Sequence, residues 1–521
     1  MRSFLVLALV GSLGFLAGCS SSGGTPVGVV TSITLSPSNA SVNAGQSVNI
    51  VATLANDSSG KGVSWTLSGA GTLSNQTTTG VTYTAPNPVT STSLPAVVAA
   101  SIASPSVTAS TPIVISPAGT IANVAPISVN GGPLVSANPP SIYTNGAFVS
   151  ILLCAPSNGA CQTIDNILVD TGSVGLRLLG SQVTVPLVPL TDTNNNTLYN
   201  CVQFLDGSFL WGTVAPANFV LGAELAFSTS VQVIANPSFT IPSGCTGTNE
   251  NTQSSLGANG ILGVGPEPFD CGLGCDPSAG GTPPAIYYLC SSGGSCNATF
   301  VSCGALCSDT AGNQQVTNPV FNFPTDNNGV IVELPAVNDV AATIPGCAVP
   351  PVQPCGSLIF GIGTQSNNAL PSTATVLNLS SDNFTTNFGG QALNMSFIDS
   401  GSNGLFFPQI NASPTICADN ITWYCPASTT PFSATNVGAS GSPSSTVNFS
   451  VDNFDNVVSA HPTDAVFSNI AGPQGNGGGC SSSNLPACTF DWGLPFFYGR
   501  NVFTAIDGTT VGTTQTPFFA Y

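Results

Sequence analysis

Basic side chains are scarce in this sequence, which has 4 Lys and Arg residues against 22 Asp and Glu residues. Binding to nucleic acid needs clustered Lys and Arg, so we expect no nucleic-acid partner. At low pH the carboxylates become neutral, which leaves Lys61, Arg177, Arg500 and His461 as the cationic side chains once the segment that contains Arg2 is removed. Self-repulsion therefore stays small in acid, which fits work at acid pH as well as it fits a plain acidic secreted surface.

Histidine is almost absent, because His461 is the single one in the chain. A Ser-His-Asp triad or a multi-histidine metal site would depend on this residue, which stands beside Pro462 in a loop-like stretch. Both kinds of site are disfavoured. We expect neither a metal nor a cofactor.

Long segments rich in Ala, Glu, Lys and Leu are also missing, and charged residues make up 5% of the chain. The 57 Gly and 41 Pro residues, with many Ser, Thr, Asn and Val, favour short strands joined by turns. The 42% of hydrophobic residues is enough to fill cores. We therefore predict an all-β globular protein of two or three domains.

The first 19 residues have the features of an export signal: Arg2, an apolar run at 4–15, and then Leu16-Ala17-Gly18-Cys19. The last four residues resemble the bacterial lipobox, which implies cleavage before Cys19 and acylation of its thiol. We expect an extracytoplasmic protein that is lipid-anchored to the bacterial cell envelope, at the outer membrane or cell surface, and that touches the membrane through the N-terminal lipid only. An ordinary cleaved signal is the alternative.

Cysteine is frequent for an exported chain, and removing Cys19 from the 17 cysteines leaves an even number, 16. Disulfides are the default in an oxidising compartment. Four pairs are close in sequence: Cys154 with Cys161, Cys347 with Cys355, Cys417 with Cys425, and Cys480 with Cys488. A Gly/Ser/Pro-rich insertion at 270–310 holds six more, whose pairing stays open: Cys271, Cys275, Cys290, Cys296, Cys303 and Cys307. A metal cluster there is the weaker alternative, because the usual Cys-x-x-Cys spacing is missing.

After a flexible tether at 20–27, residues 28–118 show short alternating runs with turn residues between them. Their spacing predicts a small β-sandwich with Trp65 in its core. The runs are 32–35, 47–52, 63–67, 81–83 and 112–115. Val63-Ser64-Trp65 and the turn at 44–47 resemble the bacterial immunoglobulin-like domains of surface proteins, which implies a spacer or, as the weaker alternative, an adhesive module.

Two stretches repeat one pattern, in which an apolar run that is typical of a buried strand ends in an aspartate. They are Asp170-Thr171-Gly172-Ser173 after 167–169, and Asp399-Ser400-Gly401-Ser402 after 396–398. Two carboxylates held close together share one proton, so one acts as a base and the other as an acid. The base can activate a water while the acid hydrogen-bonds a carbonyl, which hydrolyses an amide without a covalent intermediate.

The residues after each aspartate fit that chemistry. The glycine allows a tight turn whose amides approach the carboxylates, and the serine can hold the outer carboxylate oxygen. The first hydroxyl residue of each turn can tie the two turns together. These supporting residues are Thr171, Gly172, Ser173, Ser400, Gly401 and Ser402.

On these two motifs, on Gly260-Ile261-Leu262-Gly263 and on the ending at 498–507, residues 123–521 resemble the two-lobed pepsin-like aspartic peptidases, and also an uncharacterised bacterial lipoprotein branch of them. The resemblance implies an N-terminal lobe at 123–350, which contains the insertion, and a C-terminal lobe at 351–521. It also implies that Asp170 and Asp399 form the catalytic dyad. The flap hairpin that covers substrate would contain Phe204, Asp206, Gly207 and Ser208.

Three positions differ from the family pattern. Phe204 stands where the flap usually has tyrosine, and Arg177 stands where the tryptophan partner of that tyrosine is expected. In the second lobe, the glycine that matches Gly263 falls on Pro495, or on Gly493 if the register shifts.

The resemblance implies a monomeric aspartic endopeptidase that acts on polypeptide. The alternative within the same fold is a catalytically inactive surface lipoprotein that binds peptide or glycan in an adhesion or scaffold role. A third reading takes both aspartate turns as ordinary Asx turns of a Gly- and Ser-rich β protein.

Overall fold

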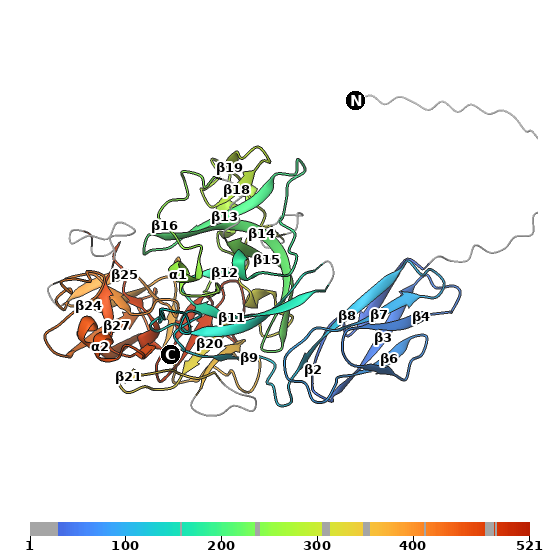
Figure 1. Cartoon of the computed structure of the whole chain (residues 1–521), viewed down its shortest axis with the longest axis horizontal. Helices are drawn as coiled ribbons and strands as arrows, with labels where there is room; N and C mark the ends of the chain where they lie inside the picture. The colour runs from blue at the N-terminus through green and yellow to red at the C-terminus, as the bar shows by residue number, and fades with distance from the viewer. Residues whose placement is uncertain are drawn as a thin grey trace, which may run out of the picture.

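The computed structural model describes residues 30–156, 159–234, 240–304, 313–346, 355–410, 413–474, 484 and 487–521. The predicted export signal, Cys19 and the tether lie outside these residues. Within them nearly every regular element is a strand, and the two α-helices, α1 (Gln253–Leu256) and α2 (Phe454–Ala460), are short (Figure 1). The predicted all-β class is confirmed. In the described ranges no helix is both long and apolar enough to cross a membrane.

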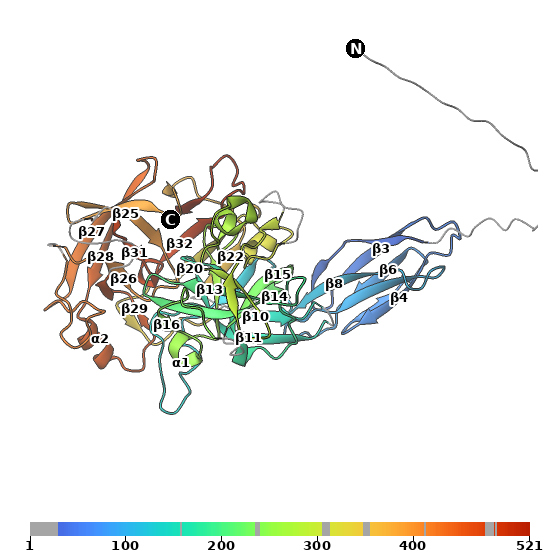
Figure 2. The ribbon, with the colours of Figure 1, turned by 90° about the horizontal axis from the view of Figure 1, so that it is seen from above.

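Residues 32–116 form two four-stranded sheets that pack on each other at one end of the molecule (Figure 2). Every predicted run lies in a strand, and Trp65 is 7% exposed in the core between the sheets. One sheet has the order β1 (Ser32–Ser36), β3 (Ser47–Ala55), β6 (Gly80–Thr84) and β5 (Thr72–Ser74). The other has β2 (Ala40–Asn43), β8 (Thr108–Ser116), β7 (Ala96–Ser101) and β4 (Val63–Ser68). The likeness to immunoglobulin-like domains stays a prediction.

The sandwich contacts the rest of the chain through a small apolar cluster. Val114 of β8 is buried against Leu152 and Val220, and Asn43 Nδ2 donates to the carbonyl of Thr120 at 3.1 Å. These contacts join the sandwich to the part of the chain that follows it.

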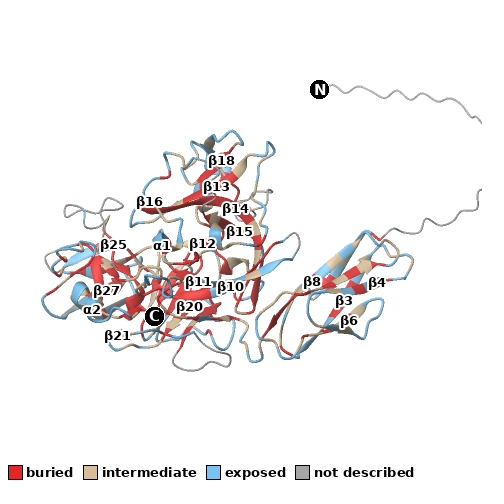
Figure 3. Cartoon of the chain, in the orientation of Figure 1, coloured by how far each residue is buried: buried red, intermediate tan, exposed pale blue. Residues whose placement is uncertain are grey.

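The first large sheet closes into a barrel, because β10 pairs with β14 as well as with β11. Most residues of its central strands are buried (Figure 3). The order is β10 (Phe148–Cys154), β11 (Cys161–Asp170), β17 (Gly260–Val264), β12 (Val174–Leu179), β15 (Glu224–Ile234), β14 (Ser208–Leu221), β13 (Thr197–Gln203), β18 (Tyr287–Cys290) and β19 (Cys296–Ala298), with β16 (Thr248–Asn249) beside β14.

A second sheet repeats the strand pairing of the first. In the first sheet, β10 and β11 form an antiparallel hairpin, β11 pairs parallel with β17, and β17 pairs antiparallel with β12. In the second sheet, β24 and β25 form the antiparallel hairpin, β25 pairs parallel with β31, and β31 pairs antiparallel with β26. The order is β28 (Ser444–Val451), β27 (Thr430–Val437), β24 (Phe384–Phe388), β25 (Gln391–Ile398), β31 (Asp491–Trp492), β26 (Leu405–Phe407) and β30 (Ala471–Pro473). The chain is therefore two-lobed, as predicted.

A six-stranded sheet takes strands from both predicted lobes. Its order is β23 (Val376–Asn378), β33 (Phe518–Ala520), β32 (Arg500–Ala505), β20 (Gly329–Leu334), β22 (Gly356–Phe360) and β9 (Val124–Ile127). The predicted lobe boundary at 350/351 lies between β20 and β22, which are neighbours in this sheet. A two-stranded ladder of β21 (Val340–Ala341) and β29 (Val466–Phe467) completes the pairing. One hydrophobic core runs through both lobes and includes Val169, Val332, Leu393, Trp492 and Val502.

Five disulfides are present in the described residues. They are Cys154–Cys161, Cys201–Cys245, Cys271–Cys275, Cys290–Cys296 and Cys417–Cys425. Two of the predicted local pairs are thus confirmed, and two pairs of the insertion are now assigned. Cys303, Cys355 and Cys488 are disulfide-bonded as well. Cys347 and Cys480, which belong to the other two predicted local pairs, lie outside the described ranges. Cys307 of the insertion lies outside them as well.

Arg177, which stands where the family pattern expects a tryptophan, is 0% exposed and holds the start of the cysteine-rich insertion. Its guanidinium donates to Asn200 Oδ1 at 2.7 Å, Gln232 Oε1 at 2.8 Å and Asp270 Oδ2 at 3.1 Å. Asp270 also accepts a hydrogen bond from the Tyr287 hydroxyl at 2.5 Å. The charge is therefore paired and its position is structural.

Arg177→Met is expected to destabilise the protein by about 3–5 kcal/mol, because it leaves Asp270 as a buried charge without its partner. Urea denaturation measures the effect. The double variant Arg177→Met/Asp270→Asn should lose less than the two single losses together, and Lys61→Met, at an exposed cation, should lose little. Equal stability of Arg177→Met and the wild type would contradict this role.

Candidate active site

Asp170 and Asp399 meet at the interface of the two lobes. Asp170 is the last residue of β11, and Asp399 directly follows β25. The amide N–H of Gly172 lies 2.9 Å from Asp170 Oδ1 and 3.1 Å from Asp399 Oδ1, so one donor reaches both carboxylates. The structure thus brings the two predicted aspartates together.

Reciprocal hydrogen bonds tie the two turns across the interface. The Thr171 hydroxyl donates to the carbonyl of Ile398 at 2.9 Å and accepts from the Ser400 amide at 2.9 Å. In mirror fashion, the Ser400 hydroxyl donates to the carbonyl of Val169 at 2.7 Å and accepts from the Thr171 amide at 3.2 Å. Both side chains are fully buried, so these bonds are shielded from water.

The two turn glycines are required by the close approach of the carboxylates. A Cβ atom on Gly172 would lie 2.6 Å from Asp399 Cγ, and one on Gly401 would lie 2.7 Å from Asp170 Cγ. Neither glycine has a positive φ, so the clash, rather than the backbone conformation, excludes larger residues. Any side chain here would push the aspartates apart.

The serines hold the outer carboxylate oxygens, as the sequence predicts. Ser173 Oγ donates to Asp170 Oδ2 at 2.5 Å, and Ser402 Oγ lies 2.8 Å from Asp399 Oδ2. Ser402 Oγ also lies 2.6 Å from Asp491 Oδ2, a residue that the sequence analysis missed. Its signal was an acidic residue inside the apolar run Phe490-Asp491-Trp492.

Burial, more than any cation, sets the protonation of this site. Burial raises the pKa of Asp399 well above its usual range, and the neighbouring charges of Asp170 and then Asp491 raise it further. The amide of Gly401, which donates to Asp399 Oδ1 at 2.7 Å, acts in the opposite direction. A carboxylic acid therefore persists beside Asp170 at pH values where an exposed aspartate is ionised.

The register of β31 decides which glycine of the second lobe matches Gly263. Asp170 stands opposite Gly263, and Ile398 stands opposite Trp492, so the residue that Asp399 faces is Gly493. A Cβ atom on Gly493 would lie 2.0 Å from a backbone oxygen, that of Gly404. The assignment to Pro495 is wrong and the shifted register is the one present, because close strand contact requires a residue without a side chain.

The predicted flap is a hairpin of β13 and β14. Phe204 N–H donates to the Ser208 carbonyl at 2.9 Å, Gly207 N–H donates to the Phe204 carbonyl at 3.1 Å, and Asp206 Oδ1 accepts from Ser208 N–H at 2.8 Å. Phe204 packs on the same apolar cluster as Tyr143. Its catalytic use stays a prediction.

Tyr143 was not identified from the sequence, and it packs in the same apolar cluster as Phe204 of the flap. Burial raises its pKa first, followed by the charges of Glu250, Asp399, Asp170 and Asp206. These neighbours belong to the flap side and to both aspartate turns, so Tyr143 brings an aromatic hydroxyl near a site whose flap has Phe204 instead of tyrosine.

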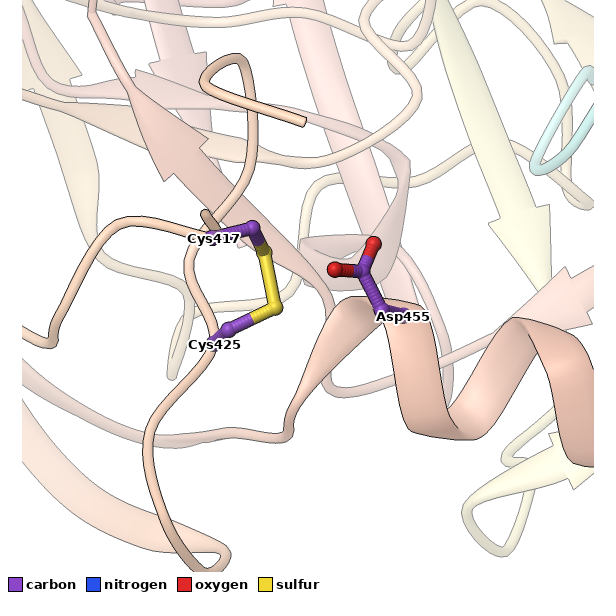
Figure 4. Close-up of side chains that lie close together, drawn as sticks. All are labelled: Cys417, Cys425 and Asp455. Atoms are coloured by element: carbon purple, nitrogen blue, oxygen red, sulfur yellow. A yellow bond between two sulfur atoms is a disulfide. The ribbon is translucent and has the colours of Figure 1, made fainter. Parts of the chain in front are cut away.

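One group of potential metal ligands, Cys417, Cys425 and Asp455, does not fit a metal ion (Figure 4). The two sulfur atoms form a disulfide and cannot act as thiolate ligands. His461 pairs with Asp464, with Nδ1 at 3.1 Å from Oδ2. Neither group adds metal or triad chemistry to the aspartate site.

A family model described as "Protein of unknown function (DUF3443)" matches residues 119–521. No curated protein matches the chain. Among solved structures, the aspartic proteinase from Irpex lacteus is similar, with 15% identity, a TM-score of 0.41, and coverage of 76% of this chain and 96% of that one. A DUF4784 family protein from Bacteroides caccae has 14% identity and a TM-score of 0.13, and the match covers 42% and 60% of the two chains.

Thr171→Val is expected to destabilise the protein by about 2–4 kcal/mol, because it leaves the Ile398 carbonyl and the Ser400 amide buried without partners. Thr171→Ser keeps the hydroxyl and should lose less than about 1 kcal/mol. Chemical denaturation measures both, with Thr435→Val at an exposed hydroxyl pair as control. If Thr171→Val and Thr171→Ser were equally stable, the reciprocal bonds would not hold the turns together.

Proposed function

The chain belongs to the family described as protein of unknown function (DUF3443), and we propose that it is an aspartic endopeptidase that hydrolyses peptide bonds with Asp170, Asp399 and an activated water. The observation that carries this proposal is the pair of carboxylates that one amide, Gly172 N–H, reaches at 2.9 and 3.1 Å. Two buried acids this close favour a form with one shared proton, since no cation belongs to their hydrogen-bond network among the described residues.

In the proposed reaction the ionised carboxylate takes a proton from a water between the aspartates, and the hydroxide attacks the scissile carbonyl carbon. The protonated carboxyl donates to the carbonyl oxygen, which becomes the hydroxyl of a tetrahedral diol. The C–N bond then breaks as the amine nitrogen takes a proton from the site and the second hydroxyl returns its proton. The dyad ends with the single proton with which it began.

The proposed substrate is an extended polypeptide. An extended chain can take main-chain hydrogen bonds from the β13–β14 hairpin, which closes over the apolar cluster of Phe204 and Tyr143. Because Phe204 has no hydroxyl, Tyr143 is the aromatic hydroxyl available near the dyad in this scheme.

In the cell, the proposal places the protein outside the cytoplasm, anchored to the envelope by a lipid on Cys19 and acting as a monomer. The residues at 20–27 and the sandwich would hold the catalytic lobes away from the membrane. The support is the sequence Leu16-Ala17-Gly18-Cys19 together with the even number of remaining cysteines.

The test uses the chain that begins after Cys19, incubated with an unfolded protein substrate from acid to neutral pH. Asp170→Asn and Asp399→Asn should each lower kcat/KM more than about 1,000-fold, because each removes a reacting group. Asp165→Asn, on the same strand as Asp170 but facing solvent, should leave the rate unchanged.

Cleavage that survives both dyad substitutions would exclude the mechanism. A wild-type chain that binds peptide but cleaves nothing at any pH would instead favour the inactive binding protein.

A further inference from the structure

Ser402 lies between two carboxyl groups, and its hydroxyl has one hydrogen to donate. Its Oγ is 2.8 Å from Asp399 Oδ2 and 2.6 Å from Asp491 Oδ2. Since the hydroxyl can donate to only one of them, the other contact needs a hydrogen that belongs to the carboxyl group. One of the two carboxyls is therefore protonated whenever both contacts are made.

The surroundings assign that hydrogen to Asp491. Asp491 is 8% exposed, and its Oδ1 is buried without a hydrogen-bond partner among the described residues. Asp399 is better supplied, since its Oδ1 accepts from the amides of Gly401 at 2.7 Å and Gly172 at 3.1 Å. The hydrogen that Asp399 retains belongs to the pair it forms with Asp170, so Asp399 Oδ2 stays an acceptor for Ser402 and Asp491 supplies the second hydrogen.

The strands packed beside Asp491 add no compensating charge. Phe397 of β25 and Phe406 of β26 stand opposite it in the ladders. The acidic groups that face it are Asp399, through Ser402, and Asp170. Ionised Asp491 would be a buried anion among anions and aromatic rings.

The first lobe has a different residue at the matching place. The parallel ladders put Ile261 of β17 opposite Leu168, two residues before Asp170, just as they put Asp491 of β31 opposite Phe397, two residues before Asp399. Among the described residues, Ser173 contacts one carboxyl group, that of Asp170, whereas Ser402 contacts both Asp399 and Asp491. The third carboxyl belongs to the Asp399 side of the dyad.

We propose that Asp491 is a protonated carboxylic acid that acts as a positioning residue for the dyad: it donates to Ser402 and so directs the Ser402 hydrogen onto Asp399. The proposal rests on the proposed function for its kinetic part only. No bond other than the O–H bonds is involved, and the protein keeps the proton throughout turnover.

Burial raises the pKa of Asp491 to about 8, against the opposing effect of the Ser402 hydrogen bond and with a further rise from the charge of Asp170. Above that pH, ionised Asp491 would accept from Ser402, and Asp399 would lose its donor. Because this acid ionises near its ordinary value in the unfolded chain, the folded state binds more protons between these two pKa values. The stability of the wild type should therefore fall as pH rises toward about 8.

The deciding experiment measures infrared pH-difference spectra of the chain that begins after Cys19. The wild type should show a carboxylic-acid C=O band that disappears with a midpoint near pH 8. In Asp491→Asn the band should lose the intensity that belongs to Asp491, while the contribution of Glu267, whose pKa burial also raises to about 8, remains. It should be unchanged in Asp165→Asn, the exposed control on β11. A band near pH 8 that keeps its full wild-type amplitude in Asp491→Asn would overturn the proposal. This readout needs no hydrolysis, so it separates failure of this inference from failure of the proposed peptidase activity.

The kinetic arm uses the amide as a permanent donor. Asp491→Asn can donate to Ser402 at every pH, so its acid-side kcat should stay within about threefold of the wild type and its activity should extend above the wild-type alkaline limit. Asp491→Leu, which has no donor, should lose at least about tenfold in kcat. Identical pH profiles for the wild type and both variants would refute the positioning role. If Asp491→Leu does not fold, the infrared spectra of the isosteric Asp491→Asn variant decide between the two outcomes.

Discussion

The reciprocal hydrogen bonds between Thr171 and Ser400 are the contact on which the rest of the site depends. They join two turns that belong to different lobes, and both side chains are fully buried. These bonds hold Gly172 and Gly401 so close to the opposite aspartates that a Cβ atom on either glycine would clash with the carboxyl group. A loss at this point leaves buried amides and carbonyls unpaired, so the dyad geometry and the stability of the interface are linked.

Because this chain has so few cations, the protonation of its buried acids depends mainly on burial and on hydrogen-bond donors. The one carboxylate that is paired with a buried arginine among the described residues, Asp270, serves the insertion and not the dyad. At the dyad, amide donors, serine hydroxyls and burial decide where protons reside. Asp491 extends the same principle, because an acid without a cation and with one oxygen unpartnered is most stable when protonated.

The positions that differ from the predicted pattern have separate surroundings in the structure. Arg177 is buried and anchors the start of the cysteine-rich insertion through Asp270, which gives this position a structural task. Phe204 of the flap hairpin and Tyr143 of the segment before β10 pack in one apolar cluster.

The sequence by itself determined the all-β class, the two aspartate turns with their supporting residues, and the local disulfides such as Cys417–Cys425, because each has a signal within a few neighbouring residues. Tertiary structure alone decided that Gly493 and not Pro495 faces Asp399, that Asp491 joins the dyad through Ser402, and that Cys201 pairs with Cys245. The reason is physical: β31 is two residues long, and the register of so short a strand is set by β25 and β26, whose pairing with it no local pattern records.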